Sequence, residues 1–239
     1  MKKIKSLSTL LLAIVLFITS CKKEETAIES TKQVLGFHWH SMIGSEDASY
    51  GIQFTTNDGI KFKISDWRYY VSNFVLIKED GTEYPITDKV FLIDIANEDY
   101  SLDSVPVGNY RGFKFTVGLD SATNHKDPTL NPASSPLALQ SPSIHWSWNS
   151  GYIFMKIEGK YDSTVAQIGG ASINQPFFFH VGTDNLKQVI DYSDEPFTVE
   201  SGEDKMLHIE MDFLKILNSV DLKTENATHT GDNLPLATK

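Results

Sequence analysis

Histidine and tryptophan are the residues of this sequence whose types and spacing could support metal chemistry. The segment Phe37-His38-Trp39-His40 places two imidazoles two residues apart. Alternate side chains of a strand point to opposite faces, so His38 and His40 would share one face and Trp39 would lie on the other. Two neutral imidazoles at this spacing can share a copper, zinc or nickel ion. Two solvated histidines flanking a core tryptophan produce the same pattern, and the spacing alone favours that simpler interpretation.

Two further segments combine aromatic residues with histidine. In the segment from Ile144 to Tyr152, Trp146 and Trp148 would share one face of an extended chain, next to His145. Large aromatic side chains contribute strongly to core burial, so a tryptophan-rich edge of the core is the simpler interpretation. The third segment, Phe177-Phe178-Phe179-His180-Val181-Gly182, is an apolar strand that ends in one histidine before a turn. His229 lies in a polar tail, and a lone histidine of either kind is more often structural than a ligand.

The sequence lacks the motifs of common enzyme classes. It contains no GxSxG elbow, phosphate-binding loop, HExxH pair, EF-hand series or dinucleotide-binding glycine pattern. Its 31 acidic residues offer too many carboxylates to pick out a catalytic pair. We therefore predict that the protein is not an enzyme.

The elements that must position these residues are mainly strands. Short apolar or alternating segments rich in β-branched and aromatic residues are separated by Gly, Asp, Asn and Pro, and Asp58-Gly59 and Asp80-Gly81 are hairpin signals. One helix with an Asp212 cap is predicted over Asp212–Val220, and His125–Ser143, with four prolines, is predicted to be a long loop. The pattern predicts an all-β protein with a single antiparallel β-sandwich domain, long loops and little helix. The predicted strands are Val34–Met42, Ile60–Ile64, Tyr69–Lys78, Val90–Asp94, Gly112–Val117, Tyr152–Lys160, Pro176–Gly182 and Lys205–Met211.

The N-terminus is typical of an exported lipoprotein. Three lysines precede an apolar run, Leu7–Ile18, which is too short to span a membrane but suits a signal peptide. Ile18-Thr19-Ser20-Cys21 resembles the lipobox of bacterial lipoproteins, so we expect cleavage of residues 1–20 and lipid on Cys21. Residues 21–32 would form a flexible tether and residues 33–239 the folded domain. The lipid would anchor the protein outside the cytoplasm, on the outer membrane facing the periplasm or the cell surface.

The charge argues against nucleic-acid binding, and the cysteine content excludes disulfides and cysteine metal sites. The signal peptide holds three of the 21 basic residues and no acid, so the mature chain has 18 Lys+Arg against 31 Asp+Glu, a formal charge of −13. Such a chain is repelled by phosphate backbones, and it has no basic run, which argues against nucleic-acid binding. Cys21 is the only cysteine, which excludes an intramolecular disulfide and a CxxC metal site.

Taken together, the motifs resemble one known family. The chain resembles the MbnP-like copper-binding proteins, named for the methanobactin operon and related to the secreted copper proteins MopE and CorA. The likeness spans nearly all of the mature domain, and its most specific element is the block Trp-Ser-Trp, Gly-Tyr, Glu-Gly. The stretches that carry it are the first strand ending in His40 with Gly44 after it, Asp66–Asn73, Trp146–Phe154 continuing to Glu158-Gly159, Phe179–Gly182 and Thr228–Thr230.

The resemblance implies a β-sandwich that binds copper, as Cu(I) in preference to Cu(II), near a tryptophan oxidised to kynurenine. His40 and His180 match histidine positions of the family and are the implied ligands. Trp146 and Trp148 match the aromatic pair and are the candidates for oxidation, which a di-haem peroxidase-like partner of the MbnH type would perform. Possible additional ligands are His38, His145 and His229. The Trp-x-His spacing of some relatives is absent from this chain.

These observations leave three hypotheses. The leading one is a lipid-anchored copper protein for storage, delivery or scavenging. The second is a metal-free lipoprotein that binds glycans or proteins, with exposed tryptophans stacking on sugar rings. Burial separates these two, since indoles in the core cannot stack on a sugar. The third is that the chain serves chiefly as a substrate of the di-haem partner.

Overall fold

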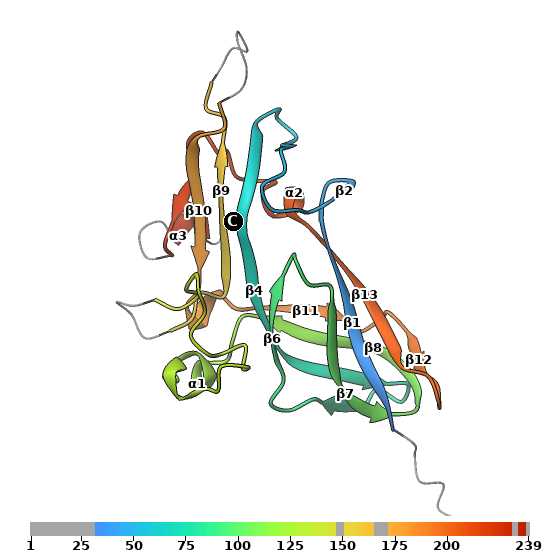
Figure 1. The fold of residues 1–239 in the computed structure, drawn as a ribbon. Coiled ribbons are helices and arrows are strands. Elements are labelled where there is room, and N and C mark those ends of the chain that lie inside the picture. Colours follow the sequence, from blue (N-terminus) through green and yellow to red (C-terminus); the bar gives the residue numbers. More distant parts are fainter. Residues whose placement is uncertain (1–31, 147–150, 165–171, 231–233, 238–239) are drawn as a thin grey trace, which may run out of the picture. The chain divides into compact units, whose positions relative to one another are not determined.

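The 18-residue strand β4 (Lys61–Lys78) organises the larger of two sheets. Its first half pairs antiparallel with β9 (Met155–Tyr161), and its second half pairs antiparallel with β8 (Gly108–Val117). On its other side β9 pairs antiparallel with β10 (Gln175–Val181), and β8 pairs antiparallel with β11 (Gln188–Tyr192) (Figure 1). In the part of the chain that the structure describes, ten strands belong to this sheet. The shorter ones are β3 (Phe54–Thr55), β5 (Glu83–Pro85), β6 (Val90–Asp94), β12 (Phe197–Val199) and β14 (Ala227–Thr228).

A four-stranded sheet provides the second layer. Its central strand, β1 (Lys32–Ile43), pairs in parallel with β13 (Lys205–Asp212) and antiparallel with β7 (Asp99–Pro106) and β2 (Glu46–Asp47). The alternation predicted for β1 is confirmed, because Phe37 and Trp39 are buried while His38 and His40 lie on the outer, partly exposed face.

The core lies between the two sheets and is strongly aromatic. The ring of Phe37 on β1 lies 5.5 Å from Phe74 on β4 and 5.5 Å from Phe113 on β8. Trp39 meets Phe115 edge to face at 5.3 Å. Ring pairs at these distances add to the stabilisation from burial alone. The predicted all-β sandwich is therefore confirmed, with most pairings antiparallel and two, β1–β13 and β10–β14, parallel.

Helices are short, as the sequence indicates. The elements are α1 (Ser121–Asn124), α2 (Phe213–Ile216), α3 (Leu234–Ala237) and the 3-10 turns η1 (Pro128–Leu130) and η2 (Asp184–Leu186). Asp212 caps α2 as predicted, since its carboxylate accepts a hydrogen bond from the Leu214 backbone N–H. The predicted helix is nevertheless too long, because α2 ends at Ile216.

The computed structural model describes residues 32–146, 151–164, 172–230 and 234–237. Residues Thr31–Lys239 form one compact unit. Cys21 and Trp148, both singled out by the sequence, lie outside the described residues. Among the helices that the structure describes, none has the length and apolar character needed to cross a membrane.

Candidate metal site

His180 and Glu158 meet on neighbouring strands of the ten-stranded sheet. In the antiparallel register of β9 and β10, Glu158 lies opposite Phe178, two residues from His180 and on the same face. The Nε2 atom of His180 lies 2.8 Å from Oε1 of Glu158. A carboxylate accepts but does not donate, so Nε2 carries the proton, and in the neutral ring Nδ1 holds the free lone pair.

The C-terminal part of the chain brings a second imidazole to this position. β14 pairs in parallel with β10, with Phe179 opposite Thr228. Thr230 fixes the segment further, because its Oγ1 accepts from the Gly182 backbone N–H at 3.0 Å and donates to the His180 carbonyl at 2.9 Å. The ring centroid of His229 consequently lies 4.8 Å from that of His180. We call these two residues the His180–His229 pair.

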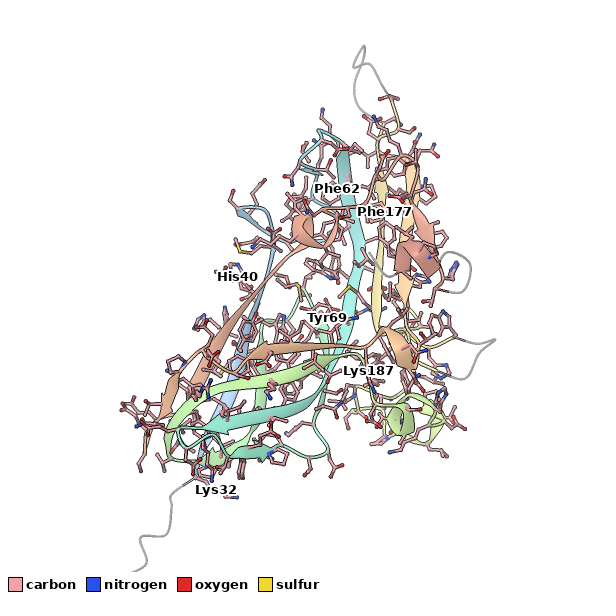
Figure 2. All side chains as sticks on the ribbon, turned by 180° about the vertical axis from the view of Figure 1, so that it is seen from behind. Lys32, His40, Phe62, Tyr69, Phe177 and Lys187 are labelled. Atoms are coloured by element: carbon pink, nitrogen blue, oxygen red, sulfur yellow. The ribbon has the colours of Figure 1, made fainter. Side chains whose placement is uncertain are left out.

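The His180–His229 pair borders an open pocket of about 420 Å³. Its floor combines apolar and charged groups, and Phe178 packs against both imidazoles at 5.5 and 4.6 Å between ring centroids. The other lining residues include Lys63, Ser65, Lys160, Pro176 and Phe177. Figure 2 labels Phe177 on β10 and Phe62 on β4, two strands separated in the sheet by β9, and the two rings are 6.4 Å apart. The pair is therefore reachable from solvent while resting on a packed aromatic layer.

A series of buried ion pairs fixes the position of the Glu158 carboxylate. Asp66 on β4 accepts two hydrogen bonds of 2.6 Å from Arg68, and this bonding raises the pKa of the Arg68 guanidinium. The ammonium of Lys156 lies 3.1 Å from Asp66 and 3.2 Å from Glu158. The side chains of Asp66, Arg68 and Lys156 are almost completely buried, so each charge depends on its partners. Glu158 is thereby fixed between Lys156 and His180.

Burial sets the protonation state of His180. Its side chain is only 12 % exposed. Loss of solvation lowers the pKa of His180 below its usual range, and this effect outweighs the hydrogen bond to Glu158, which raises it. The ring is therefore neutral at pH 7, which is the form that binds metals.

Trp146 packs directly behind the strand that carries His180. A Cβ atom added at Gly182 would lie 2.9 Å from Cη2 of Trp146 and 2.6 Å from the Tyr152 carbonyl oxygen, so only glycine fits there. Trp146 is 5 % exposed, and its indole N–H has no hydrogen-bond partner in the described part of the chain. Trp146 and Gly182, which belong to separate motifs in the sequence, thus lie next to each other.

The remaining predicted ligands lie elsewhere. His40 is on β1 of the four-stranded sheet, well separated in Figure 2 from Phe177 on β10, and its Nε2 lies 2.9 Å from Oδ1 of Asp47. His38 is hydrogen-bonded to Asp99 on β7. The structure therefore does not bring His40 and His180 together at one site.

His145 packs against a second, smaller apolar cluster that includes Tyr152. Its ring packs edge to face on Tyr152 at 4.9 Å, and burial lowers its pKa. This position is typical of a structural histidine.

The donor atoms near His180 suit a copper ion with few protein ligands better than a metal whose coordination the protein must complete. Within the described residues, no group of three or more His, Cys, Asp or Glu side chains is arranged to hold a metal ion. Imidazole nitrogens are suitable copper ligands, and the carboxylate beside His180 is the usual orienting partner of a metal-binding histidine. Sequence reasoning missed this role of Glu158, although Glu158-Gly159 belongs to the most specific block of the resemblance.

Comparisons with known proteins agree with this fold. The solved structure of MbnP from Methylosinus trichosporium is similar with a TM-score of 0.54 and 18% sequence identity, covering 80% of each chain. Among curated proteins, none matches this chain. The family model for MbnP matches residues 32–231, which is most of the chain. This protein therefore belongs to the MbnP family.

Proposed function

We propose that this protein is an exported, lipid-anchored copper-binding protein that holds Cu(I) through His180 and His229. The observation that carries the proposal is the His180–His229 pair itself, with ring centroids 4.8 Å apart and one ring oriented by a carboxylate. The resemblance to copper-binding relatives implied His180 as a ligand, and the fold supplies His229 as its neighbour.

The surroundings of the pair suit a monovalent soft cation. Neutral imidazole is a good ligand for copper, and the depressed pKa of His180 means that protons compete less for the ring. The carboxylate of Glu158 increases the basicity of His180 and offsets the charge of the cation. Two protein ligands at the edge of an open pocket leave the ion reachable, which favours delivery or scavenging over closed storage.

Export and anchoring complete the proposal. The lysine-rich start, the short apolar run and the lipobox-like Ile18–Cys21 support cleavage before Cys21 and lipidation of its thiol. The protein would then act on the outer membrane, facing the periplasm or the cell surface, without spanning the bilayer. A di-haem partner of the MbnH type would act in the same compartment.

Trp146 is the tryptophan that such a partner would oxidise if the kynurenine chemistry occurs in this member. It packs against Gly182, two residues from His180, and it lies in the apolar cluster with Tyr70 and Tyr152. Intact and peptide mass analysis of protein taken from its native host tests this directly. A mass change mapped to Trp146 supports the assignment, and an unmodified Trp146 beside a modified Trp148 contradicts it.

The alternative of a metal-free, glycan-binding lipoprotein relies on Trp146 and Trp148 stacking on sugar rings. Trp146 is buried, so it cannot stack on a sugar ring. Trp148 lies outside the described residues.

An anaerobic Cu(I) titration against a competing chelator tests the copper proposal. We compare the mature domain without the lipidated cysteine, residues 22–239, with the double variant His180→Gln/His229→Gln. The matched control is His40→Gln/His125→Gln, which removes two histidines outside the pair. One tight equivalent is expected in the parent and the control and none in the double variant. Equal Cu(I) affinity in all three proteins would overturn the assignment.

A further inference from the structure

The parallel pairing of β1 and β13 creates a second pair of histidines on the outer face of the four-stranded sheet. His38 lies directly opposite His208 in the register, and their ring centroids are 4.9 Å apart. The sequence neighbour His40 is further away, at 6.4 Å between centroids. The partner of His38 is therefore a residue that lies 170 positions away along the chain.

Asp99 orients the His38 ring. Nδ1 of His38 donates to the Asp99 carboxylate at 2.8 Å, which leaves Nε2 with the free lone pair in the neutral ring. Nε2 lies 3.7 Å from an oxygen of Glu98. A histidine whose second nitrogen donates to a carboxylate has the arrangement found in most metal-binding histidines.

The neighbourhood is reachable and negatively charged. The His38 side chain is 31 % exposed, and His208 is exposed on the same face. The carboxylates of Glu98 and Asp99 flank His38. Two more acids lie near His40: Glu210 is opposite it in the strand register, and Asp47 is hydrogen-bonded to its ring. Carboxylates gathered around two imidazoles raise the local concentration of cations.

We propose that His38 and His208 together bind one divalent transition-metal ion, with water completing its coordination. Imidazole nitrogen with nearby carboxylate suits Cu²⁺ and Zn²⁺, and Cu²⁺ binds such sites more tightly. The pair lies on the opposite sheet from His180, so this site does not rest on the Cu(I) proposal. Asp99 acts as a positioning residue that holds His38 in the metal-binding tautomer.

Calorimetric titration of the purified full chain with Zn²⁺ tests the site. Zn²⁺ binds imidazole and has no redox chemistry, so the titration measures affinity and stoichiometry without oxidation of the protein. The variants are His38→Gln, His208→Gln and Asp99→Asn, and the matched controls are His40→Gln and His125→Gln. Loss of either ligand is expected to remove the tightest Zn²⁺ equivalent, and Asp99→Asn is expected to weaken it by about 10- to 100-fold. Imidazole ¹⁵N spectra should show Zn²⁺-dependent shifts at His38 and His208.

Other outcomes separate this site from weaker explanations. Zn²⁺ affinity that falls in His40→Gln but persists in His208→Gln would overturn the pairing. Equal affinity in all variants would show adventitious binding only. Thermal unfolding of each variant checks the fold, and both His38→Gln and His208→Gln change exposed or partly exposed side chains. The His180→Gln/His229→Gln variant should keep this Zn²⁺ equivalent whether or not it binds Cu(I).

Discussion

At the scale of single residues, the chemistry of His180 depends on two opposing influences. Burial disfavours the imidazolium form, whereas the hydrogen bond to Glu158 favours it, and burial has the larger effect on the pKa. The ring stays neutral, yet its tautomer is fixed by a carboxylate that Lys156 holds in turn. A neutral imidazole whose tautomer and orientation are fixed before the metal arrives is a suitable ligand for a soft cation.

Glu158→Gln should weaken Cu(I) binding. The amide keeps the shape of the side chain but removes the charge that makes His180 more basic, so we expect a loss of about 10- to 100-fold in affinity. Competition titration with a Cu(I) chelator measures it, with the exposed Glu203→Gln as the control for total charge. A Glu158→Gln protein with parental affinity would show that the carboxylate plays no part in binding.

The pH dependence of stability should carry the signature of His180. Its pKa is lower in the folded protein than in the unfolded chain, so the unfolded state binds more protons as the pH falls below about 6.5. The free energy of unfolding of the metal-free protein should therefore decrease from that pH down to the folded-state pKa. Denaturant titrations at several pH values should show a shallower decrease in His180→Gln. An equal slope in both proteins would contradict the depressed pKa.

At the scale of elements, the sequence pattern predicts most strands of the site but not how they pair. β6 matches its predicted bounds, and β1, β10 and β13 differ by one or two residues at an end. Two predicted strands, Ile60–Ile64 and Tyr69–Lys78, are in fact the single strand β4. Ser65 and Asp66 appear as a polar break in the sequence, but the register shifts between Ile64 and Asp66, and Asp66 is buried by pairing with Arg68 and Lys156.

Strands with weaker local patterns were not predicted. β7 and β11 carry polar residues at exposed positions among their apolar ones, and β12 is only three residues long. The short β14 has no local signal, and it exists because the chain returns to pair with β10. For the same reason, no local pattern reveals that His229 meets His180 or that His208 meets His38, since both contacts depend on parallel pairing between distant segments.

The short helix α2 should contribute to stability through one aromatic side chain. Phe213 is completely buried, stacked on Phe62 at 5.4 Å and edge to face with Trp67 at 5.2 Å. Phe213→Ala should lower the free energy of unfolding by about 3–5 kcal/mol. Phe178→Ala is the matched control, because Phe178 is only partly buried and should cost about 1 kcal/mol. Urea denaturation of both variants measures the difference, and equal losses would contradict this packing.

At the scale of the whole molecule, the lipoprotein-like N-terminus supports the proposed action outside the cytoplasm, and the acidic charge suits a cation ligand. A mature chain with a formal charge of −13 attracts cations and is repelled by nucleic acids. A single lipid-modified cysteine before a polar tether would keep the sandwich domain near a membrane while leaving both of its sheets accessible.

Cys21→Ala should abolish both lipid attachment and lipoprotein processing. Without the thiol there is no site for lipid, so the variant is expected to carry no lipid mass and to keep residues 1–20, whose apolar run Leu7–Ile18 can still associate with a membrane. Fractionation of the producing bacterium, with mass analysis of the N-terminus, measures both effects. Serine at position 20 offers a control, since Ser20→Ala keeps a small residue before the cysteine and should still be processed and anchored. Membrane retention of a Cys21→Ala protein cleaved at the same place would refute lipid anchoring.

We propose that Cu(I) binds between His180 and His229, and anomalous diffraction at the copper edge tests this placement. The crystals are grown anaerobically with one equivalent of Cu(I). We predict a single strong peak in contact with His180 and His229, with Glu158 still hydrogen-bonded to Nε2 of His180. A strong copper peak at His40 without density at His180, or no ordered copper in crystals that retain the metal, would contradict the assignment.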